Sequence, residues 1–235
     1  MLDAAFFRRW LAAAAAAVDR EADRLTELDS PIGDADHGSN LRRGFTAVVA
    51  TLESTLENTL EKEPPDTPGA VLSLAGRQLI STVGGASGPL YGTLLRRTGR
   101  ALGDAPRVAR GDLADALRAG ADAVAQLGGA APGDKTMLDA LVPAVDALPS
   151  SFAAAAEAAV QGALATVPLQ ARKGRASYLG ERSIGHQDPG AASSALLFET
   201  LAETAETERA ERAERTEAAE GAEGTEGVAG RGGHE

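Results

Sequence analysis

Cysteine is absent from this chain of 235 residues, and residues that favour β-strands are scarce. Without cysteine there is no disulfide framework, so the fold does not depend on an oxidising compartment. Aromatic residues make up only 3% of the chain, and runs of β-branched residues are nearly absent. Ala, Leu, Glu and Arg dominate instead, and most of these residues favour helices. We therefore expect an all-α protein.

The sequence also lacks a long apolar run and an excess of positive charge. No apolar stretch reaches the roughly 20 residues that a membrane-spanning helix needs. The alanine-rich N-terminus looks like a signal peptide, but Asp3 comes early and Arg8 and Arg9 interrupt the apolar run. The net charge of −11 differs from the basic charge typical of nucleic-acid-binding proteins. We therefore expect a cytoplasmic protein with no membrane or nucleic-acid partner.

The last thirty residues, 206–235, differ in composition from the rest of the chain. They hold nine Glu and four Arg, and Glu recurs every third residue from Glu208 to Glu226. A period of three drifts around a helix of about 3.6 residues per turn, so the repeat forms no stable apolar face. We expect a folded domain over residues 1–204 and a disordered, solvated tail over residues 205–235.

Gly and Pro divide the folded part into eight helical segments. We expect them at residues 3–28, 39–60, 68–82, 87–102, 111–127, 134–148, 151–170 and 188–205. Short connections favour antiparallel neighbours, so every second connection of an up-and-down bundle lies at the same end. Four glycine-rich connections share one end in this way: residues 29–38, 83–88, 128–133 and 171–187. We term this the functional end, because the distinctive motifs lie in these connections.

Each of these connections leads into the N-terminus of a helix. The signals are Ser39, the Gly84–Pro89 run, Gly133 and Asp188. A helix N-terminus presents unpaired N–H groups and about half a positive charge, and glycine lets the backbone approach a phosphate closely. Four such termini together predict an anion site. For the Gly84–Pro89 run taken alone, a helix C-cap followed by an N-cap is the better interpretation, and only its position beside the aspartates makes phosphate binding equally good.

The connection between the first two helices contains three aspartates, Asp29, Asp34 and Asp36. Three carboxylates this close repel one another unless a cation lies among them. Oxygen ligands suit magnesium or calcium, and magnesium commonly completes its coordination with substrate phosphates. An EF-hand starting at Asp34 is rejected because its twelfth position is Phe45. A solvated turn with one capping aspartate does not explain three. The neighbouring His37 either orients a ligand or makes a loop hydrogen bond.

The run Gly133–Thr136 superficially resembles the end of a Walker A loop. It fails that test because Asp134 separates the Gly from the Lys and no strand precedes the run. We interpret it as a helix start, with Lys135 or Thr136 facing the functional end. Met137 then supplies an apolar wall for a base, or packs in the core.

The longest distinctive segment, residues 171–190, has little apolar content. Arg172, Lys173, Arg175 and Arg182 are the main cationic cluster of this acidic chain. A structureless loop of this length in a compact domain is usually functional or disordered. Its cations suit the oxygens of a transferring phosphoryl group. The alternative is a flexible basic loop that touches the acidic tail.

Together these motifs resemble the ADP-binding L subunits of bacterial, phosphoenolpyruvate-dependent dihydroxyacetone kinases. The resemblance covers about residues 1–204, in order and with matching spacing, and does not extend to the tail. It rests on Gly33–Gly38, Gly84–Gly92, Pro132–Met137 and Ala171–Gly190. It implies a closed barrel of eight antiparallel amphipathic helices with a nucleotide site at one end.

The same resemblance implies roles for individual residues. Asp29, Asp34 and Asp36 are the implied ligands of two magnesium ions that bridge the phosphates of ADP or ATP. The implied phosphate-holding residues are His37, Gly38, Ser39, Asn40, Ala86 and Ser87. Those implied to line the nucleotide or lie over it are Gly128, Met137, Arg175, Asp188, Pro189 and Gly190. Arg175 is also the implied catalytic residue.

The function implied is that of a nucleotide-carrying kinase subunit. In this family, a phosphohistidine on an M subunit rephosphorylates bound ADP, and the γ-phosphate passes to dihydroxyacetone held on a K subunit. A chain of 235 residues leaves no room for a substrate domain, so we expect a carrier that works only with partners. Two alternatives stay open: the nucleotide subunit of a related ketose or fatty-acid kinase, and an ADP-dependent regulator that binds a transcription factor. The sequence does not decide between the M subunit and free ATP as donor.

Overall fold

The computed structural model describes residues 1–57 and 65–226. Within these ranges, eight α-helices and one 3-10 helix make up most of the regular structure. The α-helices are α1 (Ala4–Asp29), α2 (His37–Glu57), α3 (Pro68–Thr82), α4 (Ser87–Leu102), α5 (Arg110–Gly128), α6 (Leu138–Ala147), α7 (Phe152–Ala165) and α8 (Pro189–Glu226). The 3-10 helix η1 spans Arg175–Ser183. The all-α prediction is confirmed.

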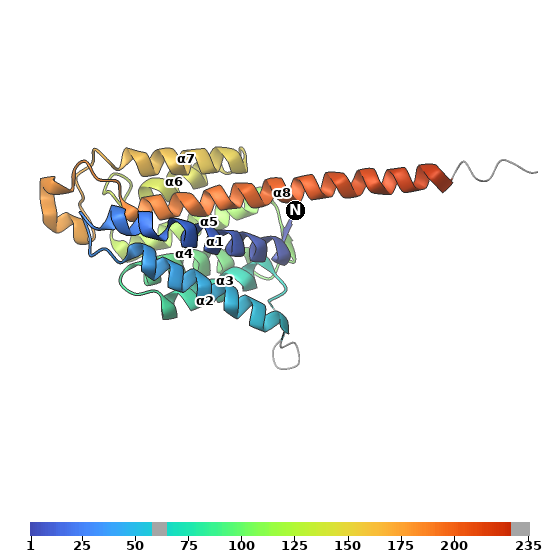
Figure 1. Ribbon diagram of the computed structural model, residues 1–235, viewed down its shortest axis with the longest axis horizontal. Helices are drawn as coiled ribbons and strands as arrows, with labels where there is room; N and C mark the ends of the chain where they lie inside the picture. Colours follow the sequence, from blue (N-terminus) through green and yellow to red (C-terminus); the bar gives the residue numbers. More distant parts are fainter. Residues whose placement is uncertain (58–64, 227–235) are drawn as a thin grey trace, which may run out of the picture.

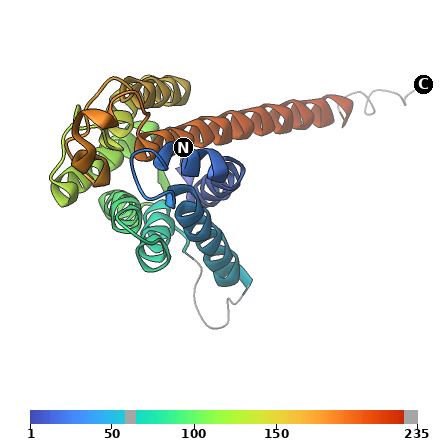
Figure 2. The ribbon, with the colours of Figure 1, turned by 60° about the vertical axis from the view of Figure 1, so that its left-hand side comes forward.

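The eight helices close into a ring. Each helix packs against the next in chain order, and α8 packs back against α1. Their axes lie roughly along the long axis of the molecule, and short connections reverse the chain at each end (Figures 1 and 2). This arrangement is the closed antiparallel barrel that the sequence predicts.

Aromatic side chains of α1 anchor the core at the point where the ring closes. Phe6, Phe7 and Trp10 are buried, and Phe7 contacts both neighbours edge-on with ring centroids 5.3 and 6.1 Å apart. The indole Nε1 of Trp10 donates to the carbonyl oxygen of Leu197 at 2.9 Å. A buried indole N–H needs such a partner, so this bond ties α1 to α8 as well as satisfying the donor.

Helices α3 and α4 approach so closely that their contact requires glycine. A β-carbon at Gly76 would lie 2.6 Å from the carbonyl oxygen of Gly92, and one at Gly92 would lie 2.6 Å from that of Gly76. Further along the pair, a β-carbon at Gly99 would lie 2.5 Å from the carbonyl oxygen of Gly69. The backbones of α3 and α4 are therefore in direct contact, which fixes the short connection between them.

At the end opposite the functional end, two short strands pair. Strand β1 (Leu2–Asp3) is antiparallel to β2 (Arg107–Val108), with Leu2 opposite Val108. The all-α prediction includes no strand here, and Val108 is buried in the core. Strands of two residues are too short for an alternating pattern to reveal them.

The predicted end of the last helix at residue 205 is wrong. Helix α8 continues to Glu226 and projects beyond the barrel (Figure 1). Ala, Glu and Arg are strong helix formers, so a helix already nucleated on the barrel propagates without an apolar face. Residues 227–235 of the predicted tail lie outside the described residues, and the division into a domain and a disordered tail stays a prediction.

Three other predicted boundaries differ from the structure by two residues or more. Helix α2 begins at His37 instead of Ser39, and its predicted extension to residue 60 lies outside the described residues. Helix α6 begins at Leu138 instead of residue 134, because Lys135 has a left-handed backbone with φ of 62°. Helix α7 ends at Ala165 instead of residue 170, because Pro168 cannot continue the hydrogen-bonding pattern.

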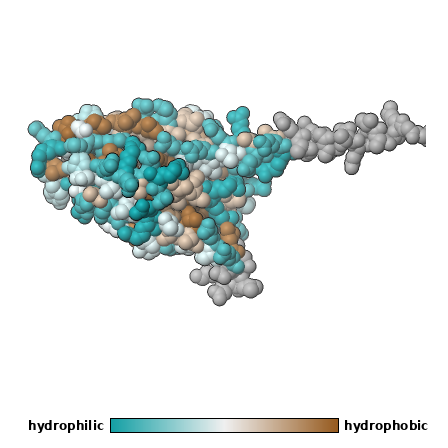
Figure 3. Space-filling view, in the orientation of Figure 1, coloured by the Kyte–Doolittle hydropathy of each residue, from teal (hydrophilic) through white to brown (hydrophobic). Residues whose placement is uncertain are grey.

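The surface of the barrel is mixed in polarity. In Figure 3, hydrophilic residues cover much of the face in view, and the apolar residues form separate patches. None of the described helices combines the length and apolar composition that crossing a membrane requires.

Candidate functional site

The four glycine-rich connections line one cavity of about 430 Å³. It lies at the end of the barrel where η1 is found, on the left of Figure 1. Its lining comes from four parts of the chain, residues 29–37, 84–91, 124–138 and 173–190. Helices α2, α4 and α8 all begin at residues that line the cavity, namely His37, Ser87 and Pro189. The predicted convergence of these connections is confirmed.

The three aspartates form a cluster at one side of this cavity. One carboxylate oxygen from each of Asp29, Asp34 and Asp36 lies within 4.8 Å of the other two. Asp29 ends α1 and is buried, Asp36 is half-buried and Asp34 is exposed. An all-oxygen donor set of this charge fits a hard divalent cation such as magnesium.

The carboxylate of Asp29 is held in place by the start of α2. Its Oδ2 accepts hydrogen bonds from the backbone N–H groups of Asp36 and His37, at 3.0 and 3.3 Å. On its other side, a β-carbon at Gly33 would lie 1.9 Å from Oδ1. Ala35 has a left-handed backbone with φ of 58°, which brings Asp34 and Asp36 to the same side as Asp29. The loop geometry therefore orients the three clustered carboxylates.

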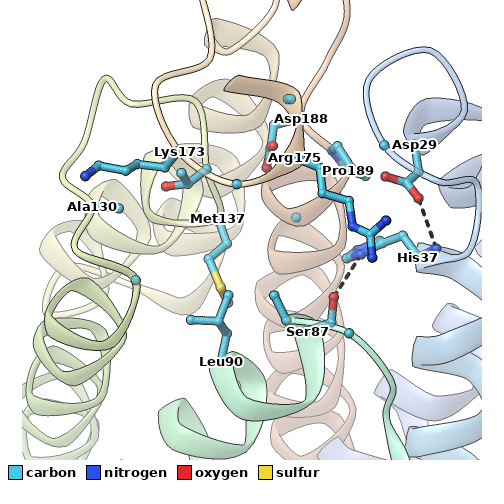
Figure 4. Close-up of a pocket in the computed structure, with 18 of the residues that line it drawn as sticks. Asp29, His37, Ser87, Leu90, Ala130, Met137, Lys173, Arg175, Asp188 and Pro189 are labelled. Atoms are coloured by element: carbon cyan, nitrogen blue, oxygen red, sulfur yellow. Dashed lines mark hydrogen bonds between the residues drawn. The ribbon is translucent and has the colours of Figure 1, made fainter. Parts of the chain in front are cut away.

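Arg175 faces the aspartate cluster from η1. Its Nη1 lies 2.8 Å from Oδ2 of Asp34, and both side chains keep contact with solvent. Figure 4 shows the Arg175 guanidinium extending toward His37 across the opening of the cavity. A phosphate bound between these groups would meet a guanidinium on one side and the cation site on the other.

His37 connects the first turn of α2 to α4 and α8. The imidazole is buried; its Nε2 lies 2.8 Å from Oγ of Ser193, and its Nδ1 lies 3.2 Å from Oγ of Ser87 (Figure 4). Burial lowers the pKa of His37, although Asp29 and Asp36 act in the opposite direction. The imidazole is therefore held in place between two serine hydroxyls beside the cavity.

Sequence reasoning missed a buried polar network beneath His37. The hydroxyl of Tyr91 lies 2.6 Å from Oγ of Ser193 and 3.0 Å from Oγ of Ser194, and donates to the carbonyl oxygen of Gly190 at 3.1 Å. Burial raises the pKa of Tyr91 to about 12, so the phenol stays protonated. The network fixes the first turn of α8 against α4. Nothing in the sequence pairs Tyr91 with serines about a hundred residues away.

Asp188 caps α8, as the sequence predicts. Its Oδ2 accepts from the backbone N–H of Ala191 at 2.7 Å, and its own N–H donates to Oγ1 of Thr166 at 2.9 Å. Burial raises the pKa of Asp188 to about 7, and the hydrogen bond from Ala191 only partly opposes this. Near neutral pH the carboxyl is therefore partly protonated, which reduces its repulsion of a bound anion.

The side of the cavity away from the aspartates is apolar. Leu90, Met137 and Ala130 lie along it, with Lys173 near its outer edge (Figure 4). The other apolar side chains of this wall are Val124, Leu127 and Leu138, and Gly128 supplies backbone. One charged end and one apolar end suit a ligand with phosphates at one end and a base at the other.

Most of the predicted nucleotide-binding residues line the cavity. They are His37, Ala86, Ser87, Gly128, Met137, Arg175, Asp188, Pro189 and Gly190. Gly38, Ser39 and Asn40 are not among the lining residues. The Oγ of Ser39 donates to the Asp36 carbonyl, and Asn40 accepts from Arg43 at 2.7 Å. Nucleotide contacts by all these residues stay predictions.

Lys135, one of the two alternatives offered for the Gly133–Thr136 run, lines the cavity at the functional end. Its side chain is only 1% exposed and points toward backbone carbonyl groups after α7 and η1. Thr136, the other alternative, lines the cavity as well. The expectation that residues 171–190 form a structureless loop is wrong, because they contain η1.

Fold and site define a helical barrel with three clustered carboxylates and the N-termini of three helices around one cavity at one end. Residues 31–203 match the DAK2 domain family. The chain is 43% identical over 206 residues to the ADP-binding subunit DhaL of the PEP-dependent dihydroxyacetone kinase of Escherichia coli K12, covering 83% of this chain and 94% of that subunit. The chain therefore belongs to the DAK2 domain family, and its resemblance to the L subunits is confirmed.

Two longer proteins contain a similar region. The D-erythrulose kinase of Mycolicibacterium smegmatis is 39% identical over 206 residues, which cover 83% of this chain but 34% of that protein. The crystal structure of the Citrobacter freundii dihydroxyacetone kinase in complex with AMP-PNP and Mg²⁺ matches with a TM-score of 0.64 and 29% identity. That match covers 85% of this chain and 34% of the kinase chain.

Proposed function

We propose that this chain is the nucleotide-carrying subunit of a dihydroxyacetone kinase. It binds ADP with magnesium at the functional end, receives a phosphoryl group from a phosphohistidine on the phosphotransferase-system M subunit, and passes it to dihydroxyacetone held on a K subunit. The observation that carries the proposal is a cavity with three clustered carboxylates at one end and an apolar wall at the other. The relative named as an ADP-binding subunit, 94% of which this chain covers, supports the same ligand.

The shape of the cavity suggests how the nucleotide is oriented. The base packs against Leu90 and Met137, and the backbone at Gly128 borders it. The phosphates lie at the charged end, between Ser87 and Arg175. A volume of about 430 Å³ lies within the usual range for small-molecule sites.

Asp29, Asp34 and Asp36 are the proposed ligands of two magnesium ions. The donor set fits this role because it offers three hard oxygens on one side of the cavity, one of them held by two backbone N–H groups. When bound, the ions would neutralise charge on the nucleotide phosphates.

The remaining groups of the site act by position and charge. The N-termini of α2, α4 and α8 border the cavity, and the partial positive charge of a helix N-terminus favours an anion there. The Arg175 guanidinium stabilises negative charge on the transferring phosphoryl oxygens, which is the catalytic role proposed for it. Asp188 repels the negative charge of the phosphates less than an ordinary aspartate does, because its pKa is raised to about 7.

A kinase for another short ketose is a second candidate. It is favoured by the 39% identity to a protein named D-erythrulose kinase. This chain covers only 34% of that protein, so the match does not decide which ketose accepts the phosphoryl group. Assays with separate K subunits, supplied with dihydroxyacetone or erythrulose, would distinguish the two acceptors. Regulation of a transcription factor through the functional end is compatible with either function.

Retention of ADP and magnesium by the purified chain tests the ligand assignment. Asp34→Ala removes one carboxylate of the cluster, so we expect it to lose both ligands while its far-ultraviolet circular dichroism stays helical. Asp19→Ala is the matched control, because Asp19 is an exposed aspartate on α1 far along the chain from the cluster. Full retention of nucleotide by Asp34→Ala would contradict the metal assignment.

A further inference from the structure

A buried ammonium group lies beneath the segment that carries Arg175. Lys135 is 1% exposed, and its Nζ donates to the backbone carbonyl oxygens of Thr166, Ser183 and Leu169 at 2.9, 2.8 and 3.0 Å. The carbonyl of His186 is a further acceptor. An ammonium group has three N–H donors and no acceptor, so a cluster of carbonyls is a fitting environment for it.

These carbonyls come from both ends of one stretch of chain. Residues 166–169 follow α7, residues 183–186 follow η1, and Arg175 lies between them at the start of η1. Backbone bonds join the same regions: Gly185 N–H donates to the Val167 carbonyl at 2.9 Å, and Arg172 N–H donates to the Asp134 carbonyl at 3.0 Å. Lys135 thus joins the two ends of the segment formed by residues 166–187.

The backbone at Lys135 supports a specific role for this side chain. Its φ of 62° is unfavourable for a residue with a β-carbon and persists only where the surrounding structure imposes it. Asp139 helps to impose it by accepting from the backbone N–H groups of Gly133 and Thr136. The conformation directs the ammonium toward the backbone carbonyls that follow α7 and η1.

The tip of the segment rests on the aspartate loop. Ile32 packs against Ala171 and Ala176 in a small apolar cluster separate from the main core. Ala176 adjoins Arg175, whose Nη1 lies 2.8 Å from Asp34. If the two ends of the 166–187 segment moved, the Arg175 guanidinium would therefore move relative to the aspartate end of the cavity.

We propose that Lys135 is a positioning residue for phosphoryl transfer. Its ammonium holds residues 166–187 in one conformation and so keeps Arg175 at the phosphate end of the cavity. The part about transfer rests on the proposed function, whereas the part about the conformation of the segment does not. Without the ammonium, at least four carbonyl oxygens lose a shared donor, and the segment loses the contact that joins its two ends.

Trypsin tests the conformational part, because the segment contains four cleavage sites, Arg172, Lys173, Arg175 and Arg182. The wild-type chain without nucleotide or magnesium should resist cleavage there. Lys135→Met keeps the length of the side chain but removes the ammonium, and should be cut at least about tenfold faster by increased opening of the segment. Arg77→Met is the control, because it removes one exposed cation from α3 and leaves all four cleavage sites in place. Rapid cleavage of the wild-type chain, or equal resistance of Lys135→Met, would overturn the proposal.

A chemical rescue covers the case in which Lys135→Met fails to fold. The chain has no cysteine, so Lys135→Cys creates a single thiol that can be alkylated in denaturant before refolding. Bromoethylamine restores an ammonium of nearly lysine length, whereas iodoacetamide leaves a neutral amide. The aminoethylated chain should regain wild-type resistance to trypsin, and the amide form should not. Equal behaviour of the two forms would exclude a role for the ammonium.

Transfer kinetics test whether Lys135 acts through Arg175. With K and M subunits present, Lys135→Met should lower kcat about tenfold or more, with a smaller change in the affinity for ADP. In the Arg175→Met background the same change should have little further effect, because non-additivity is expected of residues that act together. Fully additive losses would contradict the proposal. If the wild-type chain binds no ADP, the proposed function fails, while the trypsin comparison still decides the role of the ammonium.

Discussion

Gly33 and Asp29 are in contact at the aspartate cluster: a β-carbon at position 33 would lie 1.9 Å from Oδ1 of Asp29. The other oxygen of that carboxylate, Oδ2, accepts hydrogen bonds from the backbone N–H groups of Asp36 and His37 at the start of α2. One oxygen is thus fixed by hydrogen bonds, and the other faces a position at which any side chain would displace it.

Gly33→Ala should therefore weaken the cation site without removing a ligand. The methyl group forces the Asp29 carboxylate away from its position, and we expect the affinity for magnesium with ADP to fall about 10- to 100-fold, as for other changes in groups that orient metal ligands. Calorimetric titration of the nucleotide-free chain measures this. Gly111→Ala is the control, because a β-carbon there meets no neighbouring atom. Unchanged affinity in Gly33→Ala would show that Asp29 is not a ligand.

Arg175→Met should separate magnesium binding from phosphoryl transfer. Because Arg175 pairs with Asp34, its removal frees that carboxylate, and magnesium alone should bind about 2- to 5-fold more tightly. Transfer should become about 10²- to 10³-fold slower because a donor to the transferring group is lost. A mixed result, with magnesium binding weakened or transfer unaffected, would contradict the position assigned to the guanidinium.

Asp188→Asn should change the pH dependence of stability. Burial raises the pKa of Asp188 from 3.8 to about 7, so its contribution to the free energy of unfolding is complete below about pH 4 and is lost as the pH rises through 7. Asn can keep the cap on Ala191 N–H but does not ionise. Relative to the wild type, the variant should gain about 2 kcal/mol between pH 5 and pH 8. Urea denaturation of the nucleotide-free proteins at both pH values provides the comparison, and parallel pH profiles would contradict the assigned shift.

Gly92→Ala tests the contact between α3 and α4. An added β-carbon would meet the Gly76 carbonyl oxygen at 2.6 Å and the Ile80 side chain at 2.4 Å, so we expect a loss of about 1–3 kcal/mol in the free energy of unfolding. Gly111→Ala lies in a helix with open space around it and should be neutral or slightly stabilising. Thermal unfolding of both variants measures the difference. Equal melting temperatures would show that the helices can separate at little cost.

Local signals in the sequence predicted an up-and-down bundle and its functional end, and the resemblance to the L subunits implied closure into a barrel. Glycine and proline marked the connections, and their alternation placed residues 29–38 and 171–187 at the same end. The aspartate loop was visible because its three carboxylates lie within eight residues. The distal part of α8 was mispredicted, because a repeat without an apolar face does not prevent a helix rich in Ala, Glu and Arg.

The inward orientation of Lys135 was not predictable from spacing. Its carbonyl partners lie 31 to 51 residues away, and the left-handed backbone at Lys135 turns the side chain toward them. The hydrogen bond between Tyr91 and Ser193 joins residues 102 positions apart, so it was not predictable from spacing either. Such contacts form when the eight helices close into a ring, and composition and periodicity do not specify that closure in atomic detail.

Transfer of labelled phosphate tests the central claim most directly. Phosphoenolpyruvate carrying ³²P, the general phosphotransferase proteins and the M subunit are mixed with the purified chain, and the K subunit with dihydroxyacetone is then added. The account predicts that the label first appears on the nucleotide bound to this chain, passes to dihydroxyacetone after the second addition, and does neither with Asp34→Ala. Labelling of dihydroxyacetone without labelling of the bound nucleotide, or a nucleotide that stays unlabelled beside an active M subunit, would contradict it.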